Sequence, residues 1–200
     1  CICGSIVSTC FVKRLTHIAA AGAEASGATI TGFIECEHLD VPIYTNDRER
    51  ADGLPKEILA IKDLLEEADG LIVGAPEFNA GITSSLKNVI DWASRPRSTD
   101  GLPHKRSFEG VRNESFAGLT GVMVSGSKFE HGGFRGLFCL RNTLAAVGVT
   151  ALPESVSVPW CSPKAFTAQT MLEDEAMQAK LEALGAMLVT ELGRGASAPS

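Results

Sequence analysis

The chain has 200 residues, 44% of them hydrophobic and 21% charged, as is ordinary for one globular domain. Its formal net charge of −6 disfavours binding to nucleic acid or to an anionic membrane surface, because both need an excess of Lys and Arg. No apolar run approaches the ~20 residues of a membrane span, and no signal-peptide pattern is visible, so we expect no membrane partner.

Six cysteines are scattered along the chain, without a Cys-x-x-Cys pair or a Cys/His cluster at zinc spacing. In a domain of this size they predict reduced thiols in a cytoplasmic compartment and no metal site. The chain opens directly on the apolar run Cys1-Ile2-Cys3, which is shorter than the roughly five or six residues of a typical strand. We therefore expect a few residues of this strand to lie upstream.

Short β-rich runs alternate with helical stretches, which is the pattern of βαβ units on a parallel sheet. In chain order we expect a strand at 1–3, a helix at 11–26, a strand at 29–34, a helix at 55–67, a strand at 71–75, a helix at 83–93, a strand at 121–124, a helix at 134–147, a strand at 151–158 and a helix at 171–192. This order predicts an α/β three-layer sandwich of the flavodoxin-like type, whose five-stranded parallel sheet has the strand order 2-1-3-4-5.

The remaining segments are predicted to be irregular. Residues 35–54 form a charged loop, and residues 95–116 form a long basic segment with two interpretations, a surface excursion or a lid or subunit contact. We expect residues 1–193 to form a single domain and the small-residue stretch 194–200 to be a flexible tail.

In this topology the loops after the first, third and fourth strands lie side by side at the carboxyl edge of the sheet, where ligands bind. The first of these loops leads into a helix and carries Ser5, Ser8, Thr9 and Cys10. Unpaired N–H groups at a helix start attract phosphate, and the hydroxyls add donors. An ordinary helix cap supplied by Ser8 or Thr9 is the alternative.

The second loop, Pro76-Glu77-Phe78-Asn79-Ala80-Gly81, follows a buried strand directly. A polar turn at this place is where a flat cofactor would lie. The third loop has Ser125 and Gly126 at its start and Gly132 and Gly133 at its end, and its glycines permit close approach to a flat ligand. His131 in this loop is either a polar neighbour of the substrate or a solvated side chain.

The sequence of the second loop, followed by Leu86-Lys87-Asn88 and Asp91-Trp92, resembles the NAD(P)H-dependent FMN reductase family of flavodoxin-like quinone, flavin and chromate reductases. The resemblance extends from Gly4 to about Leu192. It implies FMN as the cofactor, NADPH or NADH as the electron donor and a small-molecule electron acceptor. It also implies a ping-pong reaction that FMN carries, without a catalytic side chain.

The family places the phosphate at the first loop and the isoalloxazine ring at the other two. We expect Asn79 and backbone amides to match the polar edge of the ring, and Gly81, with an assumed positive φ, to let the main chain come close. A plain strand-to-helix turn is the alternative. The residues implied for cofactor binding are Ser5, Ser8, Thr9, Cys10, Pro76, Glu77, Phe78, Asn79, Gly81, Ser125, Gly126, Gly132 and Gly133.

The first loop departs from the family. Val7, Cys10 and Val12 stand where the family has Arg, Ser and Asn, so polar phosphate partners are missing and FMN binding should be weakened. Two other functions stay open. One is a flavodoxin-like electron carrier, against which the weakened phosphate loop and the interface-like helix at 83–93 argue. The other is a flavin-free binding or regulatory protein.

Lys87 and Asp91 are four residues apart and share one face of a helix. They form either an ion pair within the helix or, as the resemblance implies, salt bridges across a subunit interface. Together with Trp92 they predict a homodimer or homotetramer with reciprocal contacts.

Overall fold

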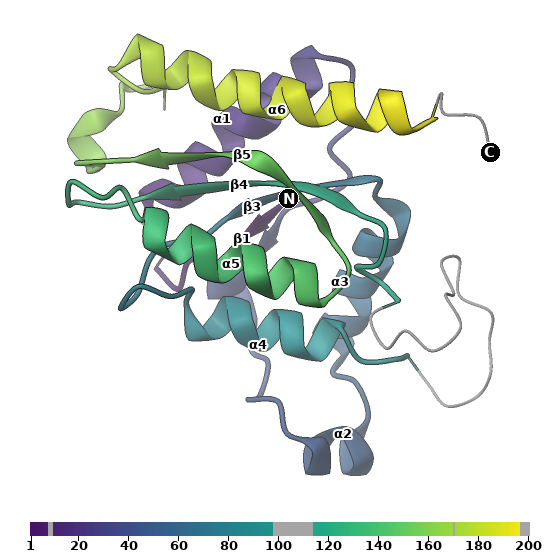
Figure 1. Ribbon diagram of the computed structural model, residues 1–200. Helices are drawn as coiled ribbons and strands as arrows, with labels where there is room; N and C mark the ends of the chain where they lie inside the picture. The colour runs from purple at the N-terminus through teal and green to yellow at the C-terminus, as the bar shows by residue number, and fades with distance from the viewer. Residues whose placement is uncertain (8–9, 98–113, 170, 197–200) are drawn as a thin grey trace.

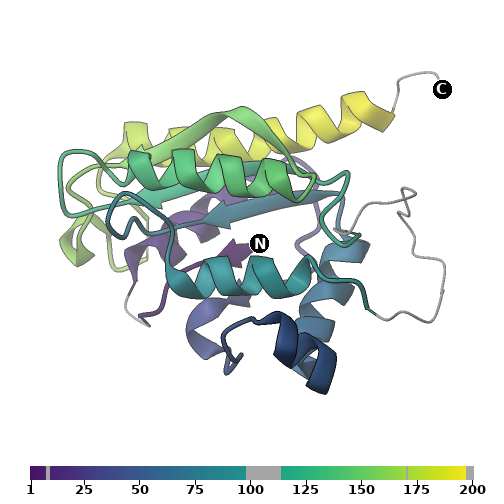
Figure 2. The same ribbon diagram turned by 60° about the horizontal axis from the view of Figure 1, so that its bottom comes forward.

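The computed structural model of the chain describes residues 1–7, 10–97, 114–169 and 171–196. Five parallel strands form one sheet in the order β2-β1-β3-β4-β5, which confirms the predicted α/β topology. Helices cover both faces of the sheet (Figures 1 and 2): α1 and α6 lie above it in Figure 1, and α3, α4 and α5 lie below it. The three-layer sandwich is therefore the one expected.

The strands are β1 (Ile2–Cys3), β2 (Ile34–Glu35), β3 (Gly70–Gly74), β4 (Thr120–Gly126) and β5 (Thr150–Val158). The predicted second strand at 29–34 is wrong over most of its length, because β2 begins only at Ile34. A strand needs a paired neighbour, and β1 offers Ile34 and Glu35 only Ile2 and Cys3 as partners. On its other side, β1 pairs the same two residues with Val73 and Gly74 of β3.

The helices are α1 (Phe11–Ala25), α2 (Asn46–Asp52), α3 (Lys56–Glu67), α4 (Ser84–Ala93), α5 (Phe134–Ala146) and α6 (Glu175–Ala196), with 3-10 turns η1 (Cys36–His38) and η2 (Pro163–Ala165). Helix α2 lies in the predicted loop 35–54. It buries none of its residues and so lacks an apolar stripe, although the Thr45 side chain caps it by accepting the Arg48 N–H. Helix α6 continues into the predicted tail 194–200 as far as Ala196.

None of the helices in the described ranges is both long enough and apolar enough to cross a membrane.

The sheet separates two apolar clusters. One packs α3, α4 and α5 against one face, and the other packs α1 and α6 against the opposite face. Helices α1 and α6 approach so closely that an added Cβ at Gly22 would overlap the Glu182 carbonyl, and one at Gly185 would overlap the Ala19 carbonyl. Glycine at these positions lets the two backbones touch.

Several titratable groups are buried in these layers. The Lys62 side chain of α3 donates to the carbonyl oxygens of Ala93 and Arg95, at 3.0 and 2.8 Å, where α4 ends. Burial lowers the pKa of Lys62 to about 8. All six cysteines are free thiols, and the three buried ones, Cys3, Cys36 and Cys161, have pKa values that burial raises to about 11, 12 and 12.

Candidate functional site

A pocket of about 400 Å³ lies between the loops that follow β3 and β4, at the carboxyl edge of the sheet. Figure 1 places these two loops at the same end of the sheet. A volume of this order is in the range of small-molecule sites, about 300–1,000 Å³. The pocket is lined by Glu77, Phe78, Asn79, Ser127, Phe129, His131, Gly133 and Arg135.

The second loop contains a tight two-residue turn. Phe78 and Gly81 exchange two backbone hydrogen bonds of 2.9 Å each, and the residues between them, Asn79 and Ala80, have φ values of 52° and 63°. Two successive left-handed residues are typical of a type I′ turn. The expected positive φ at Gly81 is therefore wrong, and an added Cβ at Gly81 would contact only the Phe78 carbonyl oxygen, at 3.5 Å.

Glu77 connects the second loop to the start of α5. Its Oε1 accepts hydrogen bonds from the Arg135 guanidinium at 2.8 and 2.6 Å, and its Oε2 accepts the Gly136 N–H at 3.0 Å. Burial alone would raise the pKa of Glu77, but the Gly136 N–H and the Arg135 guanidinium outweigh it and lower that pKa. The ionised Glu77 carboxylate thus links the second loop to the start of α5.

The third loop is held by its glycines and by Ser125. The buried Ser125 hydroxyl donates to the Ala75 carbonyl oxygen at 2.6 Å, which ties the end of β4 to the end of β3. Gly133 has a φ of 85°, and a Cβ there would overlap the Ser125 Oγ. A Cβ at Gly126 would lie 2.7 Å from a Leu15 methyl carbon. The glycines are needed for packing between loops and helices, and of these residues only Gly133 lines the pocket.

The first loop folds back on itself. The buried Ser5 hydroxyl accepts the Val7 N–H and donates to the Val7 carbonyl oxygen, both at 3.0 Å. The Gly4 carbonyl oxygen accepts a 2.5 Å hydrogen bond from the Thr83 hydroxyl at the N-cap of α4. Cys10 is the N-cap of α1 and makes no side-chain capping bond. The predicted residues Ser8 and Thr9 lie outside the described residues.

The structure thus brings some of the predicted site residues together and separates others. Glu77, Phe78, Asn79 and Gly133 line the pocket. The other described residues of the prediction do not line it: Ser5, Cys10, Pro76, Gly81, Ser125, Gly126 and Gly132.

Sequence reasoning did not assign Ser127, Phe129 and Arg135 to the site, and it considered His131 only as a possible neighbour of the substrate. Phe129 carried a usable signal, because it is an apolar residue in a polar loop. In the structure it is 70% exposed. Arg135 carried no such signal, because its place at the pocket follows from its ion pair with Glu77.

The lining of the pocket fits the flat ring of a flavin. Phe78 and Phe129 present apolar aromatic surface, and both are partly or largely exposed. The Asn79 amide and the Ser127 hydroxyl can each donate and accept hydrogen bonds, as the polar edge of such a ring requires. At the described part of the first loop, the N-cap residue Cys10 makes no side-chain hydrogen bond to the start of α1, so the backbone N–H groups there are available to a phosphate.

The predicted interface residues lie on α4. Lys87 and Asp91 form an ion pair within the helix, with Nζ 2.7 and 2.8 Å from the two carboxylate oxygens. Trp92 is only 1% exposed, donates its indole N–H to the Pro42 carbonyl oxygen at 2.7 Å and meets Tyr44 edge-on. Trp92 therefore offers no exposed surface to a second subunit, contrary to expectation.

Comparison with known proteins adds independent observations. The model of the NADPH-dependent FMN reductase family matches residues 1–160. An NAD(P)H-dependent FMN reductase of Pseudomonas aeruginosa is 30% identical over 148 residues, which cover 72% of this chain and 71% of that protein. A probable NADPH:quinone oxidoreductase of Oryza sativa subsp. japonica is 38% identical over 98 residues, 47% of this chain and 48% of that protein.

The match to the rice protein and to other curated relatives thus spans only about half of their length. Among solved structures, the flavoenzyme NAD(P)H:acceptor oxidoreductase FerB of Paracoccus denitrificans has the same fold, with a TM-score of 0.75 at 23% identity. The superposition covers 96% of this chain and 95% of that one.

Proposed function

Because the chain belongs to the NADPH-dependent FMN reductase family, we propose that it is an NAD(P)H-dependent FMN oxidoreductase that reduces quinones, flavins or similar small acceptors. The observation that carries this proposal is the pocket between the second and third loops, at the edge of the sheet where ligands of such folds bind. Its aromatic and amide lining suits a flat heterocycle.

FMN, when bound, supplies the redox chemistry by accepting a hydride and passing electrons on. The residues of this chain would bind and orient it: Phe78 and Phe129 offer flat apolar surface, and Asn79 and Ser127 offer hydrogen bonds. The Glu77–Arg135 ion pair fixes the distance between the second loop and the start of α5. No acid–base side chain is required. Donor and acceptor would occupy the same open pocket in turn.

At the first loop we expect weak retention of the cofactor. Val7 and Cys10 stand where the family has polar phosphate partners, and the Ser5 hydroxyl already bonds within its own loop. Each missing charge-assisted hydrogen bond is worth roughly 1.5–3 kcal/mol. The proposed enzyme would therefore lose FMN more readily during purification than its relatives do.

The proposal is tested by FMN titration and by NAD(P)H oxidation with a quinone, on the wild type and on Asn79→Gly. Glycine accepts the left-handed backbone that φ of 52° requires, and it removes the side chain with its amide. We expect FMN to bind at least threefold more weakly to this variant, because the ring edge loses a partner, with the melting temperature nearly unchanged. Asn142→Ala on the exposed side of α5 is the control.

Two outcomes would contradict the proposal. A wild type that binds FMN but does not oxidise NADPH or NADH in the presence of a quinone would be an electron carrier. A wild type that stays colourless after addition of FMN and removal of the free flavin would be a flavin-free relative. Unchanged FMN affinity of Asn79→Gly would show that the ring does not lie against this turn.

The assembly that we propose is a homodimer in which the outer face of α4 contributes Lys87 and Asp91. Their side chains are 50% and 37% exposed, so both are accessible for exchange of partners with a second subunit. In a two-fold symmetric contact, Lys87 of each subunit would meet Asp91 of the other.

A further inference from the structure

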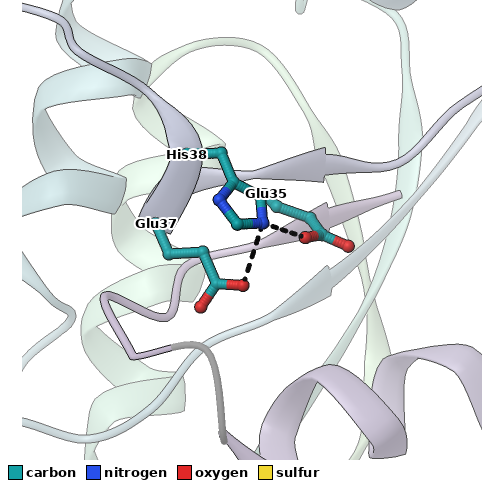
Figure 3. A group of neighbouring side chains, drawn as sticks. All are labelled: Glu35, Glu37 and His38. Carbon is teal, nitrogen blue, oxygen red and sulfur yellow. Dashed lines mark ion pairs between the residues drawn. The ribbon is translucent and has the colours of Figure 1, made fainter.

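Two carboxylates and an imidazole converge where β2 ends, on the far side of β1 from the pocket loops (Figure 3). Glu35 is the last residue of β2, and Glu37 and His38 belong to the turn η1 that follows at once. The His38 Nε2 lies 3.1 Å from Glu35 Oε2 and 3.3 Å from Glu37 Oε1. One ligand atom of each residue lies within 4.8 Å of the other two.

This spacing suits a tetrahedral metal ion. Zinc binds imidazole nitrogen and carboxylate oxygen at about 2.0–2.2 Å, which puts neighbouring ligand atoms of a tetrahedron roughly 3.3 Å apart. The two measured separations, 3.1 and 3.3 Å, agree with that edge length. One nitrogen and two oxygen ligands favour a borderline cation over Mg²⁺ or Ca²⁺, which prefer oxygen alone. The His38 side chain is 66% exposed, so a cation can reach the group from solvent.

Glu37 supplies a second and independent observation. Its side chain is only 6% exposed, and its Oε2 is buried without a hydrogen-bond partner in the described part of the chain. A buried carboxylate oxygen without a partner is costly, because it has lost its water and gained nothing in exchange. A cation bound at Glu37 Oε1 would offset the charge of this buried carboxylate and so reduce the cost of its burial.

Lys13 of α1 already places a positive charge beside the group. Its Nζ lies 2.5 Å from Glu35 Oε2 and 3.4 Å from Glu37 Oε1. A single ammonium offsets one of the two carboxylate charges, whereas a divalent cation would offset both. We propose that Glu35, Glu37 and His38 form a binding site for a borderline divalent cation such as Zn²⁺, in competition with the Lys13 ammonium.

Competition between the cation and Lys13 would also change the charge at the start of α1. Lys13 stands in the first turn of α1, and its ammonium donates to the two carboxylates that the cation would occupy. Binding of the cation would release the ammonium from them, so a free positive charge would appear at the start of α1. The site does not depend on flavin binding, and its test does not require a loaded enzyme.

The test is a Zn²⁺ titration by calorimetry on the full chain, stripped of metal and kept reduced. We expect one site in the wild type, binding at least tenfold weaker in Glu37→Gln, and binding at least threefold tighter in Lys13→Met. Glutamine keeps the shape of Glu37 and removes its charge. Lys56→Met is the matched control, because Lys56 is a 90% exposed lysine far along the chain on α3. It should leave the affinity unchanged.

If Glu37→Gln does not fold, His38→Ala replaces it, since the exposed His38 side chain contributes little to packing and its removal should also weaken binding at least tenfold. Equal affinity of the wild type and either ligand variant would assign the binding to the free cysteines and overturn the proposal. Lys13→Met that binds no tighter than Lys56→Met would overturn the competition.

Discussion

Gly133 stands where the third loop, the second loop and α5 meet. It caps α5 with a φ of 85°, and an added Cβ would overlap the Ser125 hydroxyl that ties β4 to β3. We expect Gly133→Ala to lower the free energy of unfolding by about 1–3 kcal/mol and to weaken FMN, because both strain and overlap fall on the pocket wall.

Gly81→Ala is the matched control for this prediction. Its Cβ would meet only the Phe78 carbonyl oxygen at an ordinary contact distance of 3.5 Å, so the change should stay within about 0.5 kcal/mol. Thermal unfolding and flavin titration of the two variants measure the difference. Equal effects of both substitutions would contradict the assignment of strain to Gly133.

Because of Lys62, the free energy of unfolding depends on pH in the alkaline range. Its pKa falls from 10.5 in the unfolded chain to about 8 in the folded one, so between these values the unfolded state binds more protons. The contribution of Lys62 to stability should therefore rise with pH across this window, whereas the raised pKa values of the three buried thiols act in the opposite sense in both proteins. The stability of the wild type relative to Lys62→Met should thus rise from pH 8 to 10.5. Linkage gives a relative gain of about 3 kcal/mol at most. Urea unfolding of both proteins at several values from pH 7 to 10.5 measures it, and parallel curves would contradict it.

The residues of the pocket were only partly predictable. Glu77, Phe78, Asn79 and Gly133 follow strand ends, and the topology places strand ends together, so the sequence indicated them. Arg135 lines the pocket because Glu77 holds it there, and no periodicity encodes a pairing between residues 58 positions apart. The φ of Gly81 was misjudged because a type I′ turn puts its left-handed residues before the glycine.

Between elements, α1 and α6 pack backbone against backbone at Gly22 and Gly185. We expect Gly185→Ala to lower the free energy of unfolding by about 1–3 kcal/mol, because the new methyl group would meet the α1 backbone at Ala19 and the helices would have to separate. Chemical denaturation of the full chain measures this effect.

Gly193→Ala in the same helix provides the comparison. An added Cβ at Gly193 meets nothing within 4 Å, so the gain in helix propensity, about 0.5–1 kcal/mol, should dominate. A Gly185→Ala variant as stable as Gly193→Ala would show that the contact between α1 and α6 accommodates a methyl group.

The elements themselves were predictable where they bury an apolar stripe. Helix α3 buries Ile58, Ile61 and Leu65 at helical spacing and was found almost to its ends. Helix α2 buries nothing, so its existence depends on the Thr45 cap and on local propensity, which the pattern does not reveal. The second strand was misplaced because pairing with β1, and not the β-rich composition of residues 29–33, decides where β2 begins.

For the whole molecule, the proposed dimer can be tested through the charges of Lys87 and Asp91 on α4. We expect Lys87→Glu to weaken the proposed dimer, because it places like charges opposite each other, and the added Asp91→Lys to restore it in part. The intrahelical pair that is lost is worth only about 0.2–0.5 kcal/mol, so stability should hardly change. Sedimentation measures the mass, and a wild type that is monomeric at micromolar concentration would contradict the proposal.

The six thiols differ in their exposure, and so in their reactivity, when the chain is folded. Cys3, Cys36 and Cys161 are buried, and their raised pKa values keep the reactive thiolate from forming while the chain is folded. Cys1, Cys10 and Cys139 are partly exposed. A short pulse of an alkylating reagent would therefore add at most three groups to a folded molecule and six to an unfolded one. Mass spectrometry of the intact chain would then count folded and unfolded molecules in one mixture.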